Sequence, residues 1–243
     1  MLSKEIIERK WRGSVFDVSV MCSSAGVAQQ VLVSAAARLL IDCGDGTLRD
    51  LLEAGVEPQN LDAILITHGH FDHMGGLHAL LGYLRMKCRM RPLKVIHPAG
   101  AIEVVQAVRA FERSYSDTMP FAIERSGVEG GQDLGVQGIR VRPIGVVHHG
   151  SLADGTIIGP IPAVGYRLEC DGETIAITGD SGWCKGLEEL VEGADLALIE
   201  ATFSDELDIP REATERVHLT EDLARKLGER AKNFMLVHRA SET

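Results

Sequence analysis

The segment from Thr67 to His73 constrains this chain most, because it places three histidines and an aspartate within six residues after an apolar run. The run, Ala63–Ile66, is short, branched and continuous, as in a strand buried on both faces. Leucines then recur at helical spacing, which predicts a helix over Asp72–Met86. A strand, a loop and a helix therefore hold four candidate ligands close together, namely His68, His70, Asp72 and His73.

Imidazole and carboxylate groups at this spacing indicate a metal site. A lone histidine is usually structural. A structural role would here have to explain His68, His70, Asp72 and His73 all at once, so a metal site is the better interpretation. The donor set suits zinc, manganese or iron, and the residues do not choose among them.

The order of the remaining elements predicts an α/β protein with mixed sheets. Residues 1–243 are expected to form one domain, since this length can bury a single large core. Strands are predicted at 15–20, 30–33, 38–41, 63–66, 93–96, 139–147, 163–169, 174–178, 196–199 and 235–237. Helices are predicted at 47–54, 72–86, 101–112, 186–191 and 220–232. The region 114–138 is the least regular and is expected to be a loop over the site.

Composition indicates the cellular location and the kind of partner that we expect for this protein. No signal-peptide core or membrane-length apolar stretch is present, and the five cysteines form no C-x-x-C pair, so we expect a cytoplasmic protein without membrane contact. The net charge of −10 disfavours a polyanion, whereas bound dications would still accommodate a small anionic substrate. One basic cluster, at 85–94, is either a solvated helix end or a phosphate-binding patch.

Three further strand ends carry chemically active side chains. His148 and His149 follow one strand, Asp180 follows Gly179 at the end of another, and His238 ends a third. Each has a structural alternative: Asp180 as a turn or cap residue, and His238 as a surface residue near the end of the chain.

In this order, His68-x-His70-x-Asp72-His73, His148, Gly179-Asp180 and His238 resemble the motifs of the metallo-β-lactamase fold superfamily. The resemblance covers nearly the whole chain. It implies a four-layer αβ/βα sandwich of two mixed β-sheets flanked by helices. Segments 40–47 and 76–81, together with 200–203 and 218–220, are similar to the phosphodiesterase branch, which includes ribonuclease Z and small cyclic phosphodiesterases.

The resemblance implies a site with two divalent metal ions, zinc first, with manganese or iron as alternatives. It assigns His68, His70 and His148 to one ion, and Asp72, His73 and His238 to the other. Asp180 bridges the two, and a bridging hydroxide is the nucleophile. Asp72, His218 and Glu200 are the implied catalytic residues.

Several assignments keep an alternative. The family pattern favours His148 over its neighbour His149, and two adjacent residues of a strand point to opposite faces. Asp42 either orients the histidine loop or is a strand-end turn residue. His218, oriented by Glu200, either contacts phosphate and protonates the leaving group, or merely precedes a helix capped by Thr220.

The expected activity is therefore metal-dependent hydrolysis of a small or cyclic phosphodiester. The alternatives are a ribonuclease Z-like endonuclease, a hydrolase of a lactone, thioester or β-lactam, and a non-catalytic metal-binding protein. A tRNA partner is disfavoured because no long glycine-rich, basic insertion occurs at 98–138, and because the tail after His238 is shorter than in ribonuclease Z. The apolar face of the helix over Leu77–Leu84 has two equal interpretations, a homodimer surface and packing into the core.

Overall fold

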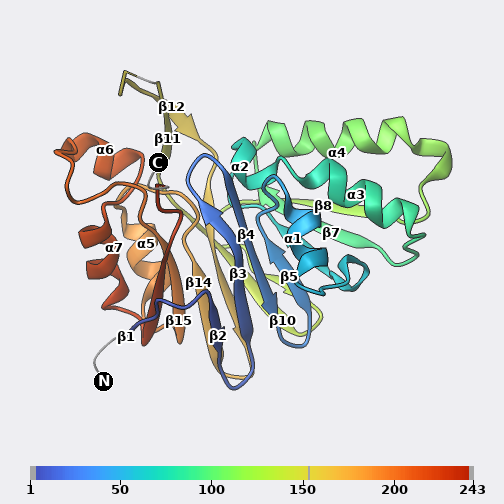
Figure 1. Cartoon of the computed structure of the whole chain (residues 1–243), viewed down its shortest axis with the longest axis horizontal. Helices are drawn as coiled ribbons and strands as arrows, with labels where there is room; N and C mark the ends of the chain where they lie inside the picture. Colours follow the sequence, from blue (N-terminus) through green and yellow to red (C-terminus); the bar gives the residue numbers. More distant parts are fainter. Residues whose placement is uncertain (1–3, 153, 241–243) are drawn as a thin grey trace.

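Two seven-stranded β-sheets pack face to face, and helices cover the outer face of each, as Figure 1 shows. The coordinates are a computed structural model, which describes residues 4–152 and 154–240. This arrangement confirms the expected four-layer αβ/βα sandwich. The first and last three residues of the chain, part of the expected leaderless start and short tail, lie outside the described residues.

The first sheet changes from antiparallel to parallel pairing along its width. Its strands, in spatial order, are β2 (Lys10–Arg12), β3 (Asp17–Ser24), β4 (Ala28–Ser34), β5 (Arg38–Ile41), β6 (Ala63–Leu65), β7 (Leu93–Pro98) and β8 (Ile123–Val128). The pairs from β2 to β5 are antiparallel, and those from β5 to β8 are parallel. Strands β5 to β8 therefore end at the same edge of the sheet.

The second sheet repeats this mixed pairing. Its spatial order is β1 (Lys4–Glu5), β16 (Asn233–Val237), β15 (Leu196–Glu200), β14 (Glu173–Ile177), β13 (Val164–Cys170), β10 (Ile139–Gly145) and β9 (Leu134–Val136). Strands β14, β15 and β16 are parallel, so they too end at one edge. A separate hairpin, β11 (His148–Ser151) and β12 (Ile157–Ile161), rises above that edge (Figure 1).

The helices divide between the two outer faces. The first sheet carries α1 (Thr47–Glu53), α2 (Phe71–Met74), α3 (Leu77–Met86) and α4 (Ile102–Ser114), with short 3-10 turns at Pro58–Asn60 and Ser116–Thr118. The second carries α5 (Lys185–Val191), α6 (Arg211–Arg216) and α7 (Glu221–Gly228) (Figure 1). In the described part of the chain, no helix combines the length and apolarity that a membrane crossing requires.

Three apolar clusters hold the layers together: one between the sheets and one under each set of helices. The inter-sheet cluster takes alternate residues from strands of both sheets, such as Val31 and Val33 of β4 and Leu196 and Leu198 of β15. The leucines of α3, at 77, 80, 81 and 84, are at most 1% exposed in the outer cluster. This face is core, so it does not supply the homodimer surface considered above.

The structure corrects several of the predicted elements. The expected helix 72–86 is two helices, because Gly76 N donates to Cys43 O and a Cβ there would collide with the Gly44 carbonyl. The expected loop 114–138 contains β8 and β9. The strand expected at 139–147 ends at Gly145, and His148 begins the hairpin. The helix expected at 220–232 begins at Glu221 and ends at Gly228.

Glu173, at the start of β14, joins the two sheets through a charged hydrogen-bond cluster. Its Oε1 accepts from Ser14 N at 2.8 Å and Ser14 Oγ at 2.9 Å, and its Oε2 accepts from Val15 N at 2.9 Å and Phe16 N at 2.7 Å. Burial raises the pKa of this carboxyl, but the hydrogen bonds from the segment before β3 outweigh burial and lower it overall. The charged form is therefore part of the folded state.

We expect Glu173→Gln to destabilise the fold by about 2 kcal/mol at neutral pH, because the amide would turn a donor toward backbone N–H groups. Because the folded-state pKa is depressed, this contribution is present above the unfolded pKa and is lost as the pH falls through the folded value. Urea denaturation of both proteins at several pH values measures it. The exposed Glu124→Gln is the matched control, and an equal gap between wild type and Glu173→Gln at every pH would contradict the account.

Candidate metal centre

The candidate ligands meet where the parallel strands of both sheets end. His68 and His70 follow β6, and Asp72 and His73 lie on the short helix α2. Asp180 follows β14, His238 follows β16, and His148 begins β11. Open α/β sheets place ligand sites at such carboxyl ends, because consecutive loops converge there.

Unusual backbone conformations aim three of these segments. Asp42, directly after β5, has φ 59°, and His238, directly after β16, has φ 52°. Non-glycine residues seldom adopt this left-handed conformation, which concentrates at functional sites. Gly179 has φ 60°, and a Cβ there would lie 2.7 Å from Thr67 Cβ, so only glycine lets Asp180 approach the β6 loop.

The first cluster consists of His68, His70, His148 and Asp180, whose ligand atoms all lie within 4.8 Å of one another. His68 Nε2 is 3.0 Å from His70 Nδ1, and His148 Nε2 is 3.3 Å from the same atom. His68 Nε2 is also 3.7 Å from Asp180 Oδ2. These are the three histidines expected to share one metal, together with the expected bridging carboxylate.

The second cluster consists of Asp72, His73 and His238, again within 4.8 Å. His73 Nε2 lies 3.2 Å from His238 Nε2, and His238 Nε2 lies 3.3 Å from Asp72 Oδ2. Asp180 Oδ1 is 3.4 Å from both His73 Nε2 and His238 Nδ1. Asp180 therefore lies between the two clusters, as expected of a bridging residue.

Hydrogen bonds orient the imidazoles. Nδ1 of His238 lies 2.9 Å from Thr202 Oγ1 and 3.4 Å from Asp180 Oδ1. Nδ1 of His73 donates to Asp42 Oδ2 at 2.8 Å, and Nδ1 of His148 donates to Val217 O at 3.0 Å. A proton on Nδ1 leaves the lone pair of Nε2 directed into the cluster, which is the state that binds a metal.

The residues present fit divalent cations. Ring nitrogens that face each other at 3.0–3.3 Å cannot all donate, and the buried Asp180 Oδ1 accepts no hydrogen bond within the described residues. Burial lowers the pKa of His68, and it lowers that of His148 to about 4, so both rings are neutral at pH 7. Burial raises the pKa of Asp180, but the positive charges of His238 and His73 outweigh this and lower it, so Asp180 is a carboxylate in the same cluster as the neutral rings of His68 and His148.

Asp42 contacts the loop that carries the histidines, in agreement with the interpretation that it orients this loop. Besides His73, its carboxylate accepts from Thr67 N at 2.8 Å and lies 3.0 Å from Thr67 Oγ1. The side chain is 1% exposed. Asp42 thus connects the end of β5 to the segments that carry His68 and His73.

His218 and Glu200 form a pair at the edge of both clusters. His218 Nδ1 donates to Glu200 Oε1 at 3.3 Å and lies 3.9 Å from Asp180 Oδ2. Burial lowers the pKa of His218, but the Glu200 carboxylate outweighs burial and raises it to about 9. Thr220 does cap α7 by accepting from Leu223 N. The contact of His218 with phosphate stays a prediction.

A third cluster was not expected: the ligand atoms of Asp180, His218 and His238 also lie within 4.8 Å of one another.

Two contacts from the β3–β4 hairpin were also missed by the sequence analysis. Gly26 N donates to Asp72 Oδ2 at 2.9 Å, and His238 N donates to Ser23 Oγ at 2.5 Å. Neither hairpin residue belongs to a ligand pattern, and the contacts span 46 and 215 residues, so the sequence held no signal for them.

The remaining histidines lie outside the clusters. His149 is turned away and its Nδ1 donates to Ile158 O at 2.8 Å, while His78 packs on Phe111. His97 bonds Pro98 O through Nδ1 at 3.0 Å. The structure therefore brings His148, and not His149, to the site.

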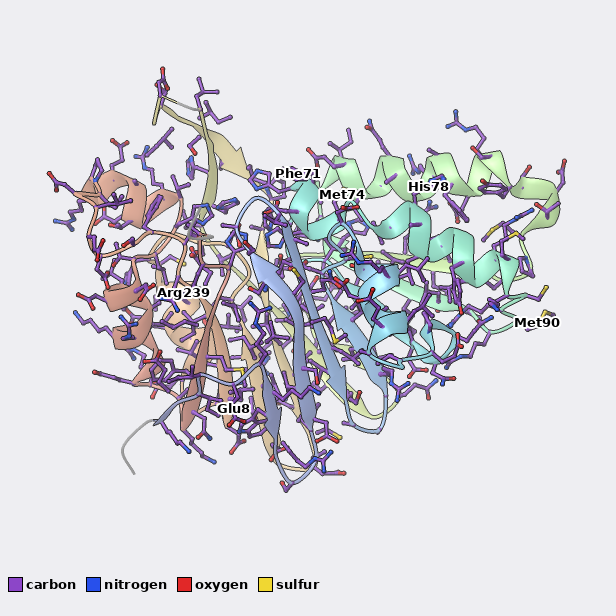
Figure 2. The ribbon with its side chains drawn as sticks, viewed as in Figure 1. Glu8, Phe71, Met74, His78, Met90 and Arg239 are labelled. Carbon is purple, nitrogen blue, oxygen red and sulfur yellow. The ribbon has the colours of Figure 1, made fainter. Side chains whose placement is uncertain are left out.

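The basic cluster at 85–94 also lies apart from the site. Figure 2 shows Met90, within this cluster, at the right-hand end of the molecule, whereas Phe71 on α2 lies near its middle. Arg89 is 2% exposed and donates to the carbonyl oxygens of Gln59, Leu61, Arg91 and Pro92. Its guanidinium is committed to loop carbonyls, which opposes the phosphate-patch interpretation.

Comparison with known proteins agrees with this geometry. The model of the beta-lactamase superfamily domain matches residues 37–238. Ribonuclease Z from a Bradyrhizobium species is 30% identical over 68% of this chain and 68% of its own length. Ribonuclease Z from Anoxybacillus flavithermus is 30% identical over 89% of this chain and 81% of its own length.

Among solved structures, human tRNase Z, short form, superposes with a TM-score of 0.75 and 24% identity, covering 92% of this chain and 93% of that one. At this identity the superposition shows a shared fold. Since the family model spans all candidate ligands, the chain belongs to the metallo-β-lactamase fold superfamily, as its His-x-His-x-Asp-His motif indicated.

Proposed function

We propose that this protein is a metal-dependent hydrolase of small or cyclic phosphodiesters, with two divalent metal ions, zinc first, held by the two clusters. His68, His70 and His148 bind one ion, Asp72, His73 and His238 bind the other, and Asp180 contacts both. When bound, two such ions activate water and stabilise the charge of an in-line displacement at phosphorus. A cytoplasmic location is part of the same proposal.

The His218–Glu200 pair beside the clusters carries the choice of phosphodiesters. Cleavage of a diester needs a proton for the leaving oxygen and a positive partner for the phosphoryl charge. Among the described residues, the side-chain hydrogen bonds of His218 all involve Nδ1, and 16% of its side chain is exposed, so Nε2 is available to a substrate. Glu200 favours the protonated ring that this role requires.

Glu200 is itself held in one orientation. Its Oε1 accepts from Ser181 N at 3.2 Å and Leu219 N at 2.9 Å, and its Oε2 accepts from Thr202 N at 3.0 Å. These bonds join the ends of β14 and β15 to the segment before α7. The pair is therefore positioned by the same strand ends that carry Asp180.

A ribonuclease Z-like endonuclease is the second candidate, because the curated relatives described above carry that name. The net charge of −10 and the distant position of the basic cluster weigh against an extended polyanion. Carbonyl substrates and a non-catalytic role remain alternatives that activity measurements separate.

We expect His218→Ala to lower kcat on an aryl phosphodiester by about 10²–10⁴-fold, the usual contribution of a general acid, while metal content is retained. The assay compares the diester with a monoester, a lactone and a β-lactam, using zinc- and manganese-loaded protein. His78→Ala, an exposed histidine on α3, is the matched control.

An unchanged diester rate in His218→Ala would remove this histidine from the mechanism. Turnover of the lactone or β-lactam alone would move the assignment to carbonyl chemistry. No turnover of any substrate by fully metal-loaded protein would favour the non-catalytic alternative.

We expect Asp42→Asn to weaken metal affinity by about 10–100-fold, because either amide orientation sets an N–H group against a donor on Thr67 or His73. Competition with a zinc chelator measures the affinity. The exposed Asp45→Asn tests for a general effect of removing a charge nearby. Equal affinities for all three proteins would show that Asp42 does not orient a ligand.

A further inference from the structure

An apolar pocket of about 430 Å³ lies between the β11–β12 hairpin and helix α6. Pockets for small ligands usually start near 300 Å³, so this one has room for a ring-sized group. Its apolar walls come from Ile157, Phe203, Ile209, Pro210, Ala213 and Val217. Nothing in the catalytic proposal uses it.

The pocket shares two walls with the candidate metal centre. Val217, on one wall, accepts the hydrogen bond from His148 Nδ1 at 3.0 Å. Phe203, on another, meets the ring of His218 edge-on, with centroids 5.5 Å apart. A group held at His148 and His218 therefore lies directly beside these walls.

The charge of the lining indicates what kind of group fits. Glu212 is the one charged side chain among the described lining residues, and its carboxylate lies 2.9 Å from Arg216 Nη1. No lysine or arginine lines the described part of the pocket, so a second phosphate would find no positive partner there. An uncharged ring, in contrast, would bury apolar surface against Ile157 and Phe203.

We propose that this pocket receives an uncharged apolar or aromatic substituent of the phosphodiester substrate. This proposal rests on the proposed function, since the phosphate at the metal centre places the substituent. The pocket then selects diesters with a ring-sized group over those with a methyl group or a further phosphate.

The test compares the binding of phenyl phosphate and methyl phosphate to zinc-loaded protein by isothermal titration calorimetry. Both probes carry the same phosphate, so the ratio of their dissociation constants isolates the substituent, and neither needs to be hydrolysed. We expect phenyl phosphate to bind at least tenfold more tightly. Ala213→Phe, which fills the pocket, should reduce the ratio below threefold. Ala110→Phe, at an exposed position of α4, should leave the ratio unchanged.

A second pair of variants guards against misfolding of Ala213→Phe. Ile157→Glu places a carboxylate in the pocket, and its neighbour Ile158→Glu points to the opposite face of β12, so only the first should abolish the ratio. A ratio near one in wild type, or a ratio that survives both pocket variants, would overturn the proposal. A tenfold ratio without diester turnover would support the pocket proposal and refute the diesterase assignment. Diester turnover with a ratio near one would support the diesterase assignment and refute the pocket proposal.

Discussion

The site depends on the compensation of two carboxylates that are buried among imidazoles. Asp72 and Asp180 are at most 5% exposed, and a buried charge is strongly unfavourable unless it is compensated. Burial lowers the pKa of His73, but Asp180 and Asp42 outweigh it and raise that pKa, so the site attracts positive charge even as protein alone. Metal ions would supply this charge, and the fold holds the donors that they need.

The fold supplies those donors because both sheets place parallel strand ends at one edge. Each strand is short and mainly apolar, and its last residue or the next one is functional: Asp42 after β5, Glu200 at the end of β15, His238 after β16. The apolar cluster between the sheets fixes the distance between the two sets of ends. The core thus sets the distance between the two sets of strand ends, and the residues at those ends supply the functional groups.

How much of this could be predicted from the sequence depends on whether the signal is local. The run Ala63–Ile66 and the His-x-His-x-Asp-His spacing are local, so the strand, the loop and the ligands were predictable. The break at Gly76 was not, because it follows from contact with the Cys43–Gly44 segment. Gly26 and Ser23 were missed for the same reason, since a hairpin far along the chain positions Asp72 and His238. That residues 1–243 form one domain stays a prediction.

The substrate side of the site follows from a second division of the molecule. His218 and Glu200 belong to the C-terminal sheet and its loops, and so do the β11–β12 hairpin and α6, which line the apolar pocket. The first sheet supplies four of the seven proposed ligands and the α2 rim at Phe71, which is 64% exposed (Figure 2). The C-terminal half therefore combines the other three proposed ligands with the residues that we propose select the substrate.

The most direct test of the two-metal account is anomalous diffraction from crystals of the zinc-loaded protein. The account predicts two peaks about 3.5–4 Å apart, the usual spacing of two-metal sites, with Asp180 between them. One ion would have the first histidine cluster as neighbours, and the other would have Asp72, His73 and His238. A single peak, or zinc bound away from these clusters, would contradict it.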